Sequence, residues 1–88
     1  MSKWMDKKNV DRYKQGIERY LEDKGTIHRV IKFDWGFQAA VELKDDYTVY
    51  AFEYQGEDQF SVKKTISEWD EEDYLVARTE EMGFITVK

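Results

Sequence analysis

Four short segments rich in β-branched and aromatic residues constrain the fold of this chain more than any other feature. They span residues 26–33, 37–44, 47–54 and 60–66. The stretches between them, "DWG", "DD" and "QGEDQ", contain residue types that form tight turns at hairpin length. The sequence therefore predicts an antiparallel β-meander of about four strands.

The alternation of side chains along these segments predicts the buried face of the meander. A two-residue turn at Asp45 and Asp46 pairs Val41 with Tyr50 and keeps the apolar residues of both strands on one face. A three-residue loop over 34–36 and a five-residue loop over 55–59 extend that face to the outer strands. The predicted core face comprises Ile31, Phe33, Phe37, Ala39, Val41, Tyr50, Phe52, Tyr54, Phe60 and Val62.

The opposite face of the predicted sheet has an apolar centre, formed by Val30, Ala40, Val49 and Ala51. Isolated exposed apolar residues are common on soluble proteins and need no special explanation. A cover, either a dimer partner or the C-terminal segment, explains the centre equally well. These four residues are therefore a candidate homodimer face.

Two helices are expected to flank the meander. Apolar residues recur at three- and four-residue spacing over 6–24, which predicts an N-terminal amphipathic helix ending before Gly25. A second helix is expected after Ile66, running to Met82 and stopped by Gly83, with a short final strand over 84–87. The expected fold is thus α+β, in a single domain covering residues 1–88.

The stretch "SEWDEEDY", residues 67–74, carries five carboxylates between Glu68 and Asp73. Ser67 suits a helix N-cap, Thr65 with Glu68 resembles a capping box, and acids in a first turn favour the helix dipole. Two or three acids would be explained in this way, but five exceed that requirement. The surplus predicts a partner-binding surface made of Glu68, Trp69, Asp70, Glu71, Glu72 and Asp73, extended by Asp45, Asp46, Glu57 and Asp58 at predicted turns.

Composition argues against several function classes. The chain has no cysteine and a single histidine, His28, so thiol catalysis, a thiolate zinc site and a histidine-based metal site are not expected. No nucleophile elbow, phosphate-binding glycine loop or calcium-loop pattern occurs in the sequence. We therefore expect a protein that is not an enzyme and binds no cofactor or metal. The lack of a signal-peptide-like or membrane-spanning apolar run predicts a cytoplasmic location.

The net charge of −5 hides an asymmetry along the chain. Residues 1–33 carry a net charge of +4, and residues 34–88 carry −9. The basic groups of the first helix alternate with acids, which is typical of a solvated face. The expected order of elements resembles the double-stranded RNA-binding domain in topology. However, the start of the second helix is acidic where that fold needs basic residues, which argues against direct nucleic-acid binding.

Small size, acidity and the lack of catalytic motifs over the whole chain resemble the small acidic host-takeover proteins of bacteriophages. Many of these proteins are DNA mimics. The resemblance implies a non-enzymatic inhibitor that occupies the DNA-binding surface of a basic protein, such as an HU-type nucleoid protein, a CRISPR effector or RNA polymerase. It also implies the host-cell cytoplasm as the location. The alternatives are a self-associating structural or regulatory domain and an immunity protein for a basic toxin.

Overall fold

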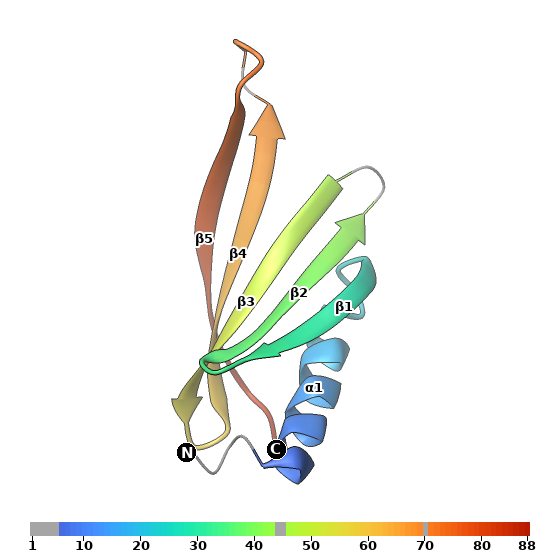
Figure 1. Cartoon of the computed structure of the whole chain (residues 1–88), viewed down its shortest axis with the longest axis vertical. Helices are drawn as coiled ribbons and strands as arrows, with labels where there is room; N and C mark the ends of the chain where they lie inside the picture. Colours follow the sequence, from blue (N-terminus) through green and yellow to red (C-terminus); the bar gives the residue numbers. More distant parts are fainter. Residues whose placement is uncertain (1–5, 44–45, 70) are drawn as a thin grey trace.

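The protein is one helix packed on a five-stranded antiparallel sheet. The computed structural model describes residues 6–43, 46–69 and 71–88. In chain order its elements are α1 (Lys7–Leu21), β1 (Thr26–Phe33), β2 (Gly36–Leu43), β3 (Asp46–Gly56), β4 (Gln59–Trp69) and β5 (Leu75–Thr86). The strands lie side by side in the order β1-β2-β3-β4-β5, so the sheet is a simple meander (Figure 1).

The N-terminal helix forms where its apolar spacing predicts, although it ends three residues earlier than expected. Tyr13, Ile17 and Leu21 lie on one helix face and are buried against the sheet. Their partners come from β2, β3 and β4, and include the fully buried rings of Phe37, Phe52 and Phe60. The predicted core residues of these three strands are confirmed.

The pairing of β2 with β3 differs from the prediction by two residues without changing the buried face. Phe37 lies opposite Phe52, and Ala39 lies opposite Tyr50. A shift of two residues preserves the side of the sheet on which each side chain lies, because successive side chains alternate. The predicted pairing of β3 with β4 is confirmed at Tyr54 and Phe60, with a tighter turn than expected at residues 57–58.

The prediction of which β1 side chains face the core is wrong. Phe33 pairs directly with Gly36, so the connection is a two-residue turn and the strand is displaced by one residue. Ile31 and Phe33 consequently lie on the open face, 42% and 36% exposed, and Val30 packs against the core. Glycine at position 36 allows β2 to approach β3 closely, because a Cβ atom there would lie 1.8 Å from the carbonyl oxygen of Phe52.

The predicted second helix is wrong, since none of the described residues in 66–69 and 71–82 is helical. Residues 66–69 continue β4, residues 71–73 form a turn, and residues 75–86 form β5. Leu75, Val76 and Met82, which the predicted helix would have turned toward the core, are all exposed in β5. The predicted capping box is also wrong. Thr65 lies in β4, and its hydroxyl forms a hydrogen bond with the hydroxyl of Thr79 across the hairpin.

Gly83, expected to stop the second helix, instead marks a bulge in β5. The pairing of β5 with β4 shifts between Val62 and Lys63, so Met82 is an extra residue next to Gly83. Gly83 has a φ angle of +91°, a conformation that glycine adopts without steric cost. The expected final strand over 84–87 is therefore the end of one long strand rather than a separate element.

Candidate protein-binding surface: the β4–β5 arm

The most prominent surface feature is the distal half of the β4–β5 hairpin, which we call the arm (residues 67–69 and 71–77). The two strands pair without interruption as far as Trp69 and Leu75. The pairing of β3 with β4 stops at Thr48 and Ile66, so the arm extends past the neighbouring strand. Figure 1 shows the arm rising beyond β1–β3 and away from α1, along the 47 Å long axis of the molecule.

The end of the arm carries the acidic stretch that the sequence singles out. Glu71, Glu72 and Asp73 lie in the turn and are exposed, and Asp73 has a φ angle of +62°, which aspartate tolerates better than most residues. The backbone of Glu68 and Trp69 forms the last residues of β4. Asp70 lies outside the described residues. The acids are therefore gathered at a hairpin tip instead of being spaced along a helix.

This geometry removes one argument for DNA mimicry. A helix would space six residues over roughly 9 Å, close to the length that carries five phosphate charges in B-DNA. A chain that reverses at a turn has no such linear spacing. What the structure retains is a compact negative tip.

The stem that carries the arm, residues 63–66 and 78–81, is close to neutral because its charges pair both across the hairpin and along β5. The Lys64 ammonium lies 3.5 Å from a carboxylate oxygen of Glu80, and the Arg78 guanidinium lies 3.3 Å from the other oxygen of that carboxylate. Lys63 stands opposite Glu81. The negative charge of the arm is consequently concentrated at its end.

Apolar side chains lie directly beside the acidic tip. Tyr74, Leu75 and Val76 are 66%, 59% and 48% exposed. Aromatic and aliphatic groups beside charges are typical of protein-binding surfaces, where the apolar groups supply affinity and the charges supply orientation. The tip therefore combines both kinds of contact.

The other predicted acidic residues are not all part of this surface. Asp46 begins β3, at the same end of the sheet as the arm, and Asp45 lies outside the described residues. Glu57 and Asp58 form the β3–β4 turn, which is at the opposite end beside the start of α1 (Figure 1). The meander separates the acids because successive hairpin turns fall at alternate ends of the sheet.

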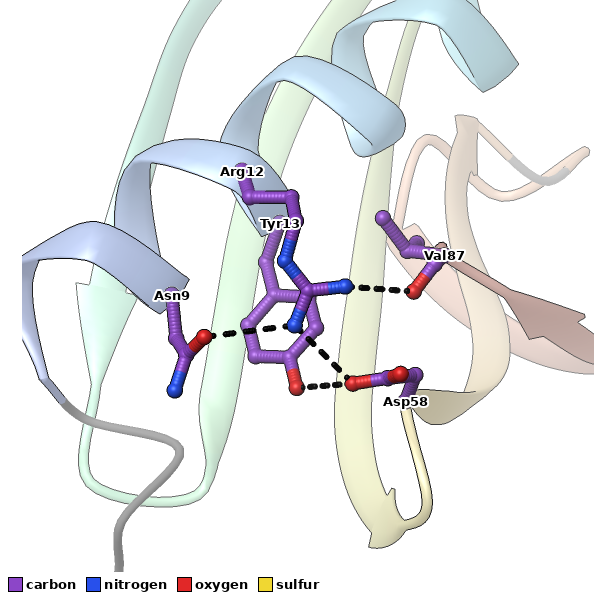
Figure 2. A network of polar contacts seen from close by, with 5 residues as sticks. All are labelled: Asn9, Arg12, Tyr13, Asp58 and Val87. Atoms are coloured by element: carbon purple, nitrogen blue, oxygen red, sulfur yellow. Dashed lines mark hydrogen bonds and ion pairs between the residues drawn. The ribbon is translucent and has the colours of Figure 1, made fainter.

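Asp58 in particular has a structural role. Its Oδ1 atom accepts a hydrogen bond from the Tyr13 hydroxyl at 2.5 Å and lies 3.1 Å from the Arg12 guanidinium (Figure 2). Arg12 also donates to the side chain of Asn9 at 3.2 Å and to the carbonyl oxygen of Val87 at 3.3 Å. The network ties α1 to the β3–β4 turn and to the end of the chain, so Asp58 is engaged within the fold.

The network also shifts two pKa values. The hydrogen bond from Tyr13, followed by that from Arg12, lowers the pKa of Asp58. Burial of the Tyr13 side chain, followed by its bond to Asp58, raises the pKa of that hydroxyl. Sequence reasoning missed this network and placed Arg12 on a solvated helix face, because no local signal connects residues 46 positions apart.

The candidate dimer face is changed by the displacement of β1. Ala40, Val49 and Ala51 lie partly buried on the open face of the sheet, as expected, and Val30 lies on the helix side. Ile31 and Phe33 take its place on the open face, and the Phe33 ring stacks on that of Trp35 with centroids 5.1 Å apart. The open face also carries His28, whose Nε2 lies 2.8 Å from the Glu42 carboxylate.

An open groove runs between α1 and the C-terminal end of β5. Its lining includes Gly16, Arg19, Tyr20, Val87 and Lys88. Gly16 permits the close approach of the two segments, since a Cβ atom there would lie 2.4 Å from a methyl group of Val87. The charged groups of the lining, Arg19 and Lys88, are basic, in contrast to the tip of the arm.

Two further properties bear on the class of site. Within residues 6–43, 46–69 and 71–88, no group of three His, Asp or Glu side chains is placed to hold a metal ion. Across the same residues, no helix is long and apolar enough to cross a membrane.

Comparison of the chain with protein-family models, with curated proteins and with solved structures found no significant match.

Proposed function

We propose that the protein is a non-enzymatic binding protein that inserts the acidic tip of its arm into the DNA-binding surface of a basic protein. The observation that carries the proposal is the projection of Glu71, Glu72 and Asp73 beyond the rest of the sheet, on a stem whose own charges are paired. A projecting tip reaches into a groove that the flat sheet could not enter. Its negative charge suits a surface that otherwise binds phosphates.

The test is competition with DNA. A purified HU-type nucleoid protein is bound to a fluorescent DNA duplex, and the protein is added while fluorescence anisotropy is recorded. We expect release of the duplex at low salt and progressive loss of competition as salt rises, because exposed charges are screened. A protein that leaves the duplex bound at every salt concentration contradicts the proposal for this class of target. RNA polymerase and a CRISPR effector are tested in the same way.

Charge reversal assigns the effect to the tip. The triple variant Glu71→Lys, Glu72→Lys and Asp73→Lys should lose competition and keep the melting temperature within a few degrees, since these side chains are exposed. The matched control reverses three exposed acids of α1 and the residue that follows it, Asp11, Glu18 and Glu22, and changes the net charge by the same amount. Equal loss in both variants would mean that overall charge acts and the tip does not.

Self-association is a second candidate function, and the exposed apolar surface favours it. Among the described residues, large apolar side chains are exposed on the open face and along β5: Ile31, Phe33, Trp35, Tyr47, Tyr74, Leu75, Val76, Met82 and Phe84. Sedimentation equilibrium of the purified protein tests this candidate, and a monomer at all concentrations would remove it.

A further inference from the structure

We propose that two copies of the protein pair through β5, edge to edge and antiparallel, with Thr79 of each copy facing Thr79 of the other. The proposal concerns a surface apart from the acidic tip and does not depend on the target proposed above. Its starting point is that β5 is an outer strand of the sheet with its neighbour, β4, on one side. A long outer strand presents backbone N–H and C=O groups to which another strand can bind.

β5 is unusually open for an outer strand. It has 12 residues, and ten of them are exposed. Natural sheets protect such edges with short strands, proline, charged side chains, bulges or a covering loop, and of these β5 has charged residues and one bulge. The bulge at Met82 and Gly83 interrupts β5 only near its C-terminal end, so Leu75–Glu81 remains regular.

Symmetry limits the possible pairings to a few. In an antiparallel pair with a two-fold axis perpendicular to the sheet, one residue must face its own copy. Opposite residues share a face and successive residues alternate, so a pairing centred between two residues is not possible. The centre must then be a single residue of the regular segment.

Charge selects Thr79 among these centres. With Thr79 at the axis, Arg78 of each copy faces the partner's Glu80, so two opposite-charge pairs form. A centre at Arg78 sets two arginines against each other, and centres at Glu80 or Glu81 set two carboxylates against each other. Like charges directly opposite in a sheet are destabilising. Within the regular segment, centres at Leu75, Val76 or Ala77 form no pair of opposite charges.

The same register brings two exposed apolar side chains together. Val76 lies beside the partner's Met82, the first residue beyond the regular segment. These side chains are 48% and 39% exposed in the single chain. The pairing therefore removes apolar surface from water in addition to joining the backbones.

The opposite edge of the sheet lacks this self-complementarity. β1 carries Arg29 and Lys32, both basic and exposed, along with His28. Two copies paired through β1 would form no pair of opposite charges, because that strand has no acidic residue. The structure therefore favours β5 as the edge that binds a second copy.

Cysteine crosslinking tests the register directly, because the natural chain has no cysteine. In the proposed dimer the Cα atoms of the two Thr79 residues are about 5 Å apart, within the range of a disulfide. Thr79→Cys should form a disulfide-linked dimer under mild oxidation. Ala77→Cys is the matched control, since it lies exposed on the same face and about 14 Å from its counterpart. Crosslinking at position 77 alone, or at neither position, overturns the proposal.

Charge exchange tests the pairing in the absence of a disulfide. Arg78→Glu and Glu80→Arg should each raise the dimer dissociation constant at least about tenfold by sedimentation equilibrium, since two pairs change sign. An equimolar mixture of the two single variants restores opposite charges between copies but not within either chain, where Arg78 and Glu80 also form an ion pair. The mixture should therefore recover dimerisation, and circular dichroism checks that each variant is folded.

Two further variants locate the interface. Arg29→Glu makes the same charge change on β1 and should leave the dimer intact. Ala40→Glu alters the open face and should also have no effect. Dissociation by Ala40→Glu but not by Arg78→Glu would assign the contact to the open face, and assemblies larger than a dimer would indicate pairing of unlike edges. Either result overturns the proposal. Failure to compete with DNA leaves these measurements unchanged, so the two proposals fail separately.

Discussion

Gly36 provides the sharpest test of how the sheet is built, through the variant Gly36→Ala. A Cβ atom at this position would lie 1.8 Å from the carbonyl oxygen of Phe52 and 2.9 Å from its carbonyl carbon. Both are backbone atoms of the adjacent strand, so no side-chain rotation relieves the overlap. β2 and β3 must separate at the end of the sheet where Phe37 and Phe52 are buried against each other.

The expected cost has two sources. A non-glycine residue at the Gly36 φ angle of +154° stores about 1–3 kcal/mol of backbone strain. Separation of the strands also weakens the hydrogen bond from the Tyr54 N–H to the Trp35 carbonyl, which measures 2.9 Å and is worth about 1 kcal/mol. The total is about 3 kcal/mol. For a domain of this size the corresponding fall in melting temperature is about 12–24 °C.

The measurement is thermal unfolding followed by circular dichroism, with Gly83→Ala as the matched control. Gly83 also has a positive φ angle, +91°, but no atom lies within 4 Å of the position of its missing Cβ. The control therefore carries strain without overlap and should cost about 1–2 kcal/mol. If Gly36→Ala is no more destabilising than Gly83→Ala, the close approach of β2 and β3 is refuted.

Two further predictions concern the interior and the polar network. Phe60→Ala removes a fully buried ring that contacts Tyr13, Phe37 and Tyr54, and should lower the free energy of unfolding by about 3–5 kcal/mol in urea denaturation; a loss below about 1 kcal/mol would show that this ring is not part of the core. Asp58→Asn removes a carboxylate whose pKa is lowered by folding, so wild type should have the higher melting temperature above the ordinary pKa of 3.8, and this advantage should disappear as the pH falls through the lower folded-state pKa. A difference that stays constant from neutral pH to strong acid would contradict the role assigned to Asp58.

The sequence by itself determined the elements whose signals are local. The stripe of Tyr13, Ile17 and Leu21 predicted α1, and the alternation of Phe37, Ala39 and Val41 predicted the buried face of β2. These signals are reliable because a side chain's face depends on the period of its own segment. For the same reason, the two-residue error in pairing β2 with β3 left the core unchanged.

Tertiary structure decided everything that depends on a distant partner. The position of Gly36 against Phe52 set the β1–β2 turn and thereby exchanged Val30 with Ile31 and Phe33 between the two faces. Residues 66–69 and 71–82 include acids suited to a helix start, but they form a long hairpin in which β5 pairs with β4 along its length. The contacts of Asp58 with Arg12 and Tyr13 join residues that are distant in the sequence, so they exist only in the folded chain.

The acidic stretch has one property that the sequence sets, its charge, and one that the tertiary structure sets, its position. Its charge is a property of the sequence, and that charge alone marks residues 68–73 as the candidate binding site. Its arrangement as the tip of an exposed arm, with an open strand edge beside it, follows from pairing between β4 and β5. Charge is carried by individual residues, whereas shape and edge are created by contacts between segments, and only the folded chain contains those.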